Sequence, residues 1–279
     1  METIELAYDV YEYNDTRQDL PPIILLHGMT WSKYMYREVC SKLCQKTKRK
    51  VYCLDLRNHG ESPFSEKMDI FVMTEDVKRF LTEHDCKRVT FVAHSFSCTI
   101  SYLIAIHQPE IVEKMVMVDS FPFNDFYEDM KGNFVPEIQA QNRVLKALNP
   151  KMSLKDARTK LNKLAQMGPK AKELFYKKLA HDLMKEDGKF KWKVNIDFIH
   201  KAILAEFPGF SDKREGFCTH EILFVRCSNS YNIPDSRFEK ILKYCPNSKL
   251  ITIEDTTHLV LLEKVDEFVD VVHDFLTPV

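Results

Sequence analysis

Glycine is scarce in this chain, with only seven residues among 279. The chain has no glycine-rich phosphate loop and no dinucleotide-binding fingerprint, so the sequence predicts no nucleotide cofactor. The formal net charge is −1, which provides no overall field to attract nucleic acid, and we expect no such partner. No apolar run approaches the roughly 20 residues that a membrane-spanning helix needs.

The eight cysteines lack the spacing of a metal site. None belongs to a Cys-x-x-Cys pair, and no group of histidine and cysteine has zinc-ligand spacing, so we expect no metal. Several lie within apolar segments, which is typical of reduced, buried thiols in an intracellular protein. The first residues resemble neither a signal peptide nor a transit segment. We therefore expect a cytoplasmic protein, or a mitochondrial one if a leader has been trimmed.

Apolar runs alternate with helical patterns at both ends of the chain, and residues 4–13 indicate an edge strand. The runs typical of buried strands are 23–26, 51–55, 89–93, 114–119, 221–226 and 249–253. Helical spacing occurs over 34–45, 73–83, 101–107, 236–244 and 265–275. This alternation predicts an α/β fold whose mostly parallel central sheet is flanked by helices.

Residues 121–219 differ from the rest of the chain. Helical patterns follow one another there with no strand between them, over 135–148, 153–167, 170–184 and 195–207. We predict a helical lid at 121–219, inserted between core segments 1–120 and 220–279. Residues 151–193 contain 13 lysines or arginines against five acidic residues. A solvated helical face explains this excess most simply, and contact with an anionic substrate or a membrane is the alternative.

Ser95 lies where an apolar strand ends and a helix begins without a loop. Such a turn lifts the serine hydroxyl clear of the backbone, and it needs small residues two positions before and after the serine. Ala93 and Ser97 are small, but the usual pattern has glycine at both positions. By itself the pattern is explained more simply by a strand end followed by a serine helix cap.

Several polar residues fall at or just after predicted strand ends and should therefore share one rim of the sheet. They are His27, Asp55, Ser95, Asp119, Ser230 and His258. A serine hydroxyl becomes a nucleophile when an imidazole removes its proton, and a carboxylate orients that imidazole. The order Ser95, Asp119, His258 predicts nucleophile, acid and base.

Two backbone amides, those of Met29 and Phe96, are predicted to stabilise the oxyanion of a tetrahedral intermediate. His27 precedes Met29, and a structural histidine explains it more simply than a base. The polar loop 55–63 is likewise explained by internal hydrogen bonds.

The carboxylate has two candidates. Its commonest place, after the penultimate strand, is occupied by Ser230. We favour Asp119, which ends the strand that follows the serine unit, with Ser230 as a further hydrogen-bond partner of His258 or Asp119. Asp235 is the alternative acid, although it also suits a helix N-terminus.

The motifs together resemble one branch of the α/β-hydrolases, which includes abhydrolase domain-containing protein 11 and bacterial short-chain acyl esterases. The residues that carry the resemblance are 27–29, 55–63, 93–97, 118–122, 189–195 and 229–230. The resemblance implies a serine esterase, thioesterase or lipase-like acyl hydrolase, with Asp119 as the acid and a small-molecule acyl ester as substrate. A hydrolase-like ligand-binding or receptor protein with slow turnover is the alternative, because the serine turn lacks both glycines.

Aromatic and methionine residues in the predicted lid suggest an apolar acyl pocket, although such residues also pack helices together. They are Phe123, Phe126, Tyr127, Met130, Phe134, Met167 and Phe175.

Overall fold

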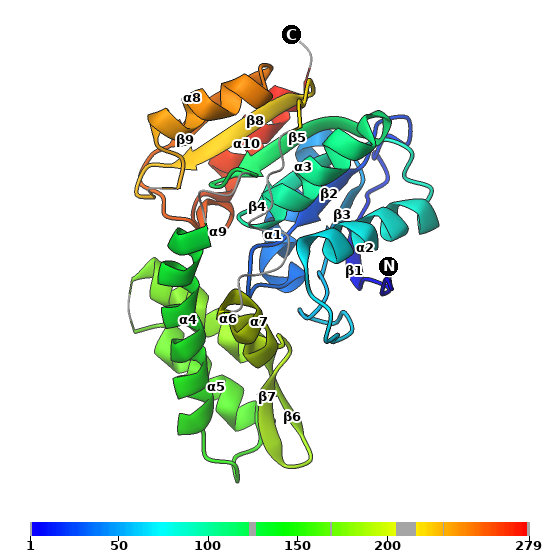
Figure 1. Cartoon of the computed structure of the whole chain (residues 1–279). Coiled ribbons are helices and arrows are strands. Elements are labelled where there is room, and N and C mark those ends of the chain that lie inside the picture. The colour runs from blue at the N-terminus through cyan, green and yellow to red at the C-terminus, as the bar shows by residue number, and fades with distance from the viewer. Residues whose placement is uncertain (1, 123–126, 168, 205–215, 231, 278–279) are drawn as a thin grey trace.

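The computed structural model describes residues 2–122, 127–167, 169–204, 216–230 and 232–277, and its main feature is a seven-stranded sheet (Figure 1). The strand order is β1-β3-β2-β4-β5-β8-β9, in which β1 is antiparallel to β3 and the other neighbours are parallel. The strands are β1 (Tyr8–Tyr11), β2 (Ile23–Leu26), β3 (Val51–Leu54), β4 (Val89–His94), β5 (Val112–Val118), β8 (Glu221–Cys227) and β9 (Ser248–Ile253). The predicted α/β architecture with a mostly parallel sheet is confirmed.

Helices cover both faces of this sheet. One face carries α2 (Ile70–Glu83), α3 (Ser97–His107) and α8 (Asp235–Tyr244), and the other carries α1 (Arg37–Thr47) and α10 (Val265–Leu276) (Figure 1). Short helical turns are η1 (Lys33–Tyr36), η2 (Pro109–Ile111) and α9 (Val260–Glu263). Because both faces are covered, every residue of β2 and β4 is buried, which explains their continuous apolar runs.

Between β5 and β8 the chain forms a separate group of elements, shown below the sheet in Figure 1. We call its described residues, 127–167 and 169–204, the insert. It contains α4 (Tyr127–Ala147), α5 (Leu154–Ala165), α6 (Lys170–Asp182), β6 (Leu183–Glu186), β7 (Lys189–Trp192) and α7 (Ile196–Leu204). Its action as a lid, and the boundaries at 121 and 219, stay predictions.

The expectation that no strand interrupts this region was wrong. Strands β6 and β7 pair as an antiparallel hairpin, and α6 ends at Asp182 rather than at residue 184. The turn residues Asp187 and Gly188 both have positive φ, at 49° and 76°. An Asp-Gly pair between short alternating segments is a strong hairpin signal, so the sequence contained the information that the helical interpretation overlooked.

All eight cysteines are buried and none forms a disulfide. None of the described helices is long and apolar enough to cross a membrane.

Candidate active site

Ser95 occupies the sharp turn between β4 and α3. Its φ of 61° lies in the left-handed region, which a non-glycine residue adopts only when the surroundings impose it. The residue is buried, and its Oγ has no hydrogen-bond partner within the described part of the chain. Buried hydroxyls are nearly always bonded, so a hydroxyl left without a partner here is the feature of this turn that needs a chemical explanation.

Ser97 fits the turn where glycine is usual. Its Oγ accepts a hydrogen bond from the His94 amide at 3.1 Å, and its one hydroxyl hydrogen has two acceptors within reach, the His94 carbonyl at 2.9 Å and the Leu26 carbonyl at 3.1 Å. The hydroxyl therefore joins the ends of β2 and β4, and both of its polar functions are satisfied inside the core. At this position the side chain braces the turn through hydrogen bonds.

Gly28 allows the loop after β2 to approach the serine turn. A Cβ atom at this position would lie 2.9 Å from His94 Nδ1 and 3.5 Å from the Ser95 Cβ. The first distance is too short for any side chain, so glycine is required. The close approach places the next residue, Met29, in the same cavity as Ser95.

Asp119 and His258 meet although 139 positions separate them. Asp119 Oδ2 lies 2.8 Å from His258 Nδ1, and the carboxylate also accepts the Cys227 amide at 3.2 Å. Burial acts to raise the pKa of Asp119, but hydrogen bonding and charge from His258, with help from Ser230, hold it below its usual value. The carboxylate therefore stays ionised and fixes the proton of the imidazole on Nδ1, leaving Nε2 as the basic nitrogen.

Asn232 is a member of this site that the sequence did not single out. Its Nδ2 donates to Asp119 Oδ2 at 3.0 Å and to the Asp119 carbonyl at 3.1 Å, and lies 3.0 Å from His258 Nδ1. Since that ring nitrogen donates to Asp119, the amide hydrogens of Asn232 serve the aspartate. Ser230 supports the arrangement, because its Oγ accepts the Asn232 backbone amide at 3.3 Å.

Asp235, the alternative acid, is elsewhere. It opens α8, its side chain is 86% exposed, and it pairs with Arg226 at 2.6 Å. The structure therefore brings Asp119, and not Asp235, to the histidine.

His94 is a second residue that sequence reasoning missed. Its Nε2 donates to the His258 carbonyl at 2.7 Å, and its Nδ1 accepts the Tyr36 hydroxyl at 2.7 Å. Burial, with the nearby His258, lowers the pKa of His94 to about 3. The neutral ring of His94, the residue before Ser95, thus connects the serine turn to the backbone of His258. Its position directly before the serine was the sequence signal that could have identified it.

His27 acts through structure, as its simpler interpretation predicts. Its Nδ1 donates to the Gly28 carbonyl at 2.8 Å and its Nε2 accepts the Leu56 amide at 3.0 Å. Burial lowers its pKa to about 4, so the ring is neutral. His59 similarly accepts the Thr30 amide at 3.2 Å. These two rings join the loops after β2 and β3.

The loop 55–63 is held by its own hydrogen bonds. The Asp55 carboxylate accepts the amides of Lys33 at 2.7 Å and Glu61 at 2.9 Å, and Arg57 pairs with buried Asp76 at 2.6 Å. Asp55 therefore braces the rim and does not line the cavity of Ser95.

The amides of Met29 and Phe96 were predicted to be the oxyanion donors, and this role stays a prediction. Phe96 follows Ser95 and precedes the first residue of α3. Neither amide donates a hydrogen bond to another described residue. The Thr30 amide, by contrast, is engaged by His59. An amide without a protein partner is what the predicted role requires.

Ser95 and His258 line one cavity of about 300 Å³. Its walls come from the core loops and from two insert helices: Gly28, Met29, Trp31, His94, Ser95, Glu137, Phe175, Thr257, His258 and Leu259. Of the residues predicted to form an acyl pocket, Phe175 lies in this wall and Met167 is 70% exposed. The other five side chains lie outside the described residues.

Glu137 brings a carboxylate from α4 into this wall and was not predicted. The Thr30 hydroxyl donates to Glu137 Oε1 at 2.8 Å, and Gln141 donates to the same oxygen at 3.0 Å. Among the described residues, no group of three His, Cys, Asp or Glu side chains is arranged to hold a metal ion.

Comparison with known proteins identifies the family. Residues 21–190 match the family described as alpha/beta hydrolase fold. The chain is 28% identical over 276 residues to the sn-1-specific diacylglycerol lipase ABHD11 of Xenopus laevis, covering 98% of this chain and 84% of that protein. It is 24% identical over 294 residues to Ethanol acetyltransferase 1 of Wickerhamomyces anomalus, covering 98% and 74%.

Among solved structures, one called "Marine microorganism esterase" matches with a TM-score of 0.80 and 23% identity, covering 98% of this chain and all of the other. At that identity the match establishes the fold alone. The resemblance on which the sequence analysis relied is confirmed by these matches.

Proposed function

The chain belongs to the α/β-hydrolase family, and we propose that it is a serine hydrolase that cleaves carboxylic esters through an acyl-enzyme. Ser95 is the nucleophile, His258 the general base and Asp119 the residue that orients His258. The observation that carries the proposal is the pairing of Asp119 with His258 Nδ1 at the edge of the cavity that Ser95 also lines.

In the acylation step, His258 Nε2 takes the proton of Ser95 as Oγ attacks the ester carbonyl carbon. The carbonyl π electrons move to oxygen, and the amides of Met29 and Phe96 stabilise the resulting oxyanion. Each such donor typically contributes about 3–4 kcal/mol. The intermediate collapses, the bond to the leaving alcohol breaks, and His258 returns the proton to that alcohol.

In the deacylation step, water replaces the alcohol. His258 removes a proton from the water, the resulting hydroxide attacks the acyl carbon, and the carboxylic acid leaves as Ser95 regains its proton. Asp119 stays ionised throughout and stabilises the imidazolium that forms twice in each cycle. Its lowered pKa supports this role.

Acyl esters are the substrate class that the cavity favours. Met29, Trp31, Phe175 and Leu259 give it an apolar wall that suits an acyl chain. Two relatives carry names of acyl chemistry, a diacylglycerol lipase and an ethanol acetyltransferase. We extend the proposal to acyl lipids and thioesters, with the insert acting as the lid of the cavity.

Hydrolysis of p-nitrophenyl esters from acetate to palmitate tests the proposal. We expect Ser95→Ala to lower kcat by about four orders of magnitude or more, because the remaining groups cannot form an acyl-enzyme. Ser101→Ala is the matched control, since it removes a buried hydroxyl of α3 whose hydrogen bond among the described residues is to the Cys98 carbonyl. Its activity should stay within about threefold of wild type.

Intact-protein mass spectrometry after treatment with a fluorophosphonate gives a second measurement. The wild-type protein should gain one adduct, located on Ser95. If wild type and Ser95→Ala are equally inert toward every ester and neither is labelled, the enzyme proposal fails. The protein would then be a ligand-binding member of the family, the function that the missing glycines of the serine turn favour.

A further inference from the structure

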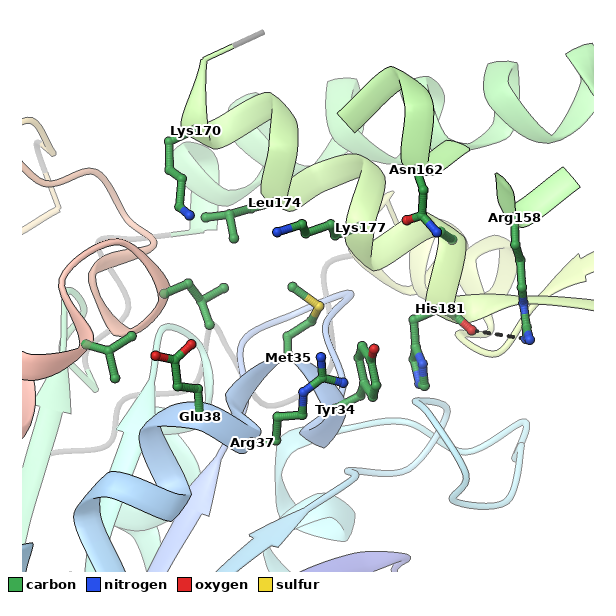
Figure 2. Close-up of a pocket in the computed structure, with 13 residues that line it drawn as sticks. Tyr34, Met35, Arg37, Glu38, Arg158, Asn162, Lys170, Leu174, Lys177 and His181 are labelled. Atoms are coloured by element: carbon green, nitrogen blue, oxygen red, sulfur yellow. Dashed lines mark hydrogen bonds between the residues drawn. The ribbon is translucent and has the colours of Figure 1, made fainter. Parts of the chain in front are cut away.

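A second cleft, of about 460 Å³, lies between the insert and the core (Figure 2). Its core side comes from η1, the first turn of α1 and the α9–α10 region, and its insert side comes from α5 and α6. Figure 2 shows Tyr34 and Arg37 on the core side, facing Lys170, Leu174 and Lys177 of α6 across the opening. The cleft is therefore built by two parts of the chain that the sequence keeps far apart.

Basic side chains predominate in this cleft. Arg37, Arg158, Lys170 and Lys177 line it, whereas Glu38 is the one carboxylate among its lining residues. Glu38 pairs with Lys42, outside the cleft, at 3.2 Å.

These four cations have few carboxylates of their own. Lys170 and Lys177 share a single acid, Glu173. Within the described part of the chain, neither Arg37 nor Arg158 pairs with a carboxylate. Arg158 instead donates from Nε and Nη2 to the carbonyls of Leu183 and His181, which fixes its guanidinium beside the cleft. The cleft thus has more cationic than carboxylate side chains, and Glu173 and Glu38 balance only part of the positive charge.

Arg37 is held in place by aromatic rings rather than by an acid. Its guanidinium carbon lies 3.9 Å from the centre of the Tyr34 ring, and Tyr34 stacks on His181 with 3.4 Å between ring centres. Burial, together with Lys193 and Arg158, lowers the pKa of His181 to about 4, so this ring adds no charge. The stack orders the guanidinium and leaves its N–H donors for a ligand.

The cleft adjoins the cavity of Ser95, because the same three segments of the chain line both. Residues 31, 175 and 259 line the cavity of Ser95. Their near neighbours in the sequence, 34–35, 174 and 262, line the cleft. A substrate whose acyl group lies at Ser95 could therefore extend its leaving group between α1 and α6.

We propose that this cleft binds the phosphate group of a phosphate-bearing leaving group, making phosphorylated acyl esters or thioesters the preferred substrates. The proposal rests on the hydrolase function above. Two arginines and two lysines around one opening suit a dianionic phosphate, because guanidinium and ammonium groups both form charge-assisted hydrogen bonds to its oxygens. A glycerophosphate lipid and a nucleotide thioester present this same chemistry at different distances from the acyl carbon.

Two matched substrate pairs test the proposal and separate these sources. The first pair is butyryl-coenzyme A and butyryl-pantetheine, which share the acyl thioester and the pantetheine arm and differ in the phosphorylated nucleotide. The second is 1-oleoylglycerol 3-phosphate and 1-oleoylglycerol. In the pair that matches the natural leaving group, we expect kcat/KM to be about tenfold higher for the phosphorylated substrate than for its neutral partner, through a lower KM. The preference should decline between 50 and 500 mM salt, because the cations are near solvent.

Arg37→Gln should reduce this preference about three- to tenfold while leaving hydrolysis of the neutral member unchanged. Arg37 is exposed, so the variant should fold normally, and Arg37→Lys should retain part of the preference. Lys163→Gln is the matched control: it removes one positive charge from exposed α5 outside the cleft. It should change the preference by less than twofold.

Binding to Ser95→Ala keeps the test independent of turnover. Calorimetry with coenzyme A and glycerol 3-phosphate should detect binding of one of them, weakened by Arg37→Gln. Equal kcat/KM within both pairs, or a preference that Arg37→Gln leaves intact, would overturn the phosphate site while the esterase remains. If no ester is hydrolysed but Arg37 still governs phosphate binding, the esterase proposal fails and the site stands.

Discussion

The rim around Ser95 and the insert use ionisable side chains in opposite ways. In the rim, His27, His59 and His94 are buried, and burial lowers the pKa of each ring, so the three histidines stay neutral while their hydrogen bonds fix their positions. In the insert, most lysines face solvent, and one pair, Lys178 and Asp182, is buried. The rim thus fixes geometry through neutral rings, whereas the insert presents charge. The difference matches their proposed roles of holding a catalytic site and recognising a substrate.

The two regions meet at the segment that follows Met29. Thr30 bonds to Glu137 at 2.8 Å, Ser32 approaches Asp182 at 3.5 Å, and Tyr34 stacks on His181. Each contact joins the loop of a proposed oxyanion donor to an insert helix. Movement of the insert would therefore disturb that loop, which gives the insert a direct physical route to the chemistry.

Substitution of Asp119 should have the largest effect on the rim. Asp119→Asn keeps the shape but removes the charge, and the amide no longer holds His258 in the required tautomer. We expect kcat to fall by about 10³- to 10⁴-fold. Steady-state hydrolysis of p-nitrophenyl butyrate measures the fall.

Asp235→Asn is the control for this substitution and should leave kcat within about twofold, since its carboxylate pairs with Arg226 at the surface. If Asp235→Asn were the damaging change, the assignment of the acid would be wrong.

In the insert, substitution of Lys178 should have the largest effect on stability. Lys178 Nζ lies 3.1 Å from Asp182 and 3.2 Å from Gln141 Oε1, and both charged side chains are almost completely buried. Lys178→Met would leave the Asp182 carboxylate without its cation, at a cost of about 3–5 kcal/mol in the free energy of unfolding.

Chemical denaturation measures that cost. The double variant Lys178→Met/Asp182→Leu is the control and should recover most of the lost stability, because it removes both charges together. A double variant less stable than Lys178→Met would show that the pair itself, and not the orphaned charge, dominates.

Sequence patterns predicted the core better than the insert. Each apolar run became a strand of the sheet, although the edge strand β9 is only partly buried. Asp119 and His258 met because strand ends of a parallel sheet share one edge. The hairpin at 183–192 was missed, although Asp187-Gly188 signals a turn.

Asn232, His94 and Glu137 could not be assigned in advance, for a common physical reason. Their partners lie 113, 164 and 107 positions away, and only the packed fold brings these atoms together. Local sequence patterns indicate which face of a helix or strand is apolar. They do not indicate which distant polar group a given polar side chain will contact.

The neutral histidines of the rim should make stability depend on pH. Folded His27 has a pKa of about 4, whereas an unfolded histidine titrates near 6.5. As pH falls from 7 to 5, the unfolded chain therefore gains protons first, and stability falls by about 2 kcal/mol for each such histidine. Asp55 acts in the opposite direction, because its folded pKa is raised to about 6 by burial.

Urea denaturation at pH 7 and pH 5 isolates the contribution of one ring. The decrease in the free energy of unfolding from pH 7 to pH 5 should be about 2 kcal/mol smaller in His27→Asn than in wild type. An identical loss in His27→Asn and wild type would show that this ring is not kept neutral by the fold.

Substitution of Ser97 should have the smallest effect of these changes, and it tests how the rim holds the turn of Ser95. Ser97→Gly restores the usual glycine of the turn but removes the hydroxyl that joins the Leu26 carbonyl to the His94 amide. We expect the free energy of unfolding to fall by about 1–2 kcal/mol, from the lost hydrogen bonds and the greater freedom of glycine when unfolded. Turnover of p-nitrophenyl butyrate should not rise, because the hydroxyl already fits the turn. Ser97→Ala separates the two causes, since it loses the hydrogen bonds without adding backbone freedom. A Ser97→Gly variant that is faster than wild type would show instead that the serine crowds the turn and restrains the nucleophile.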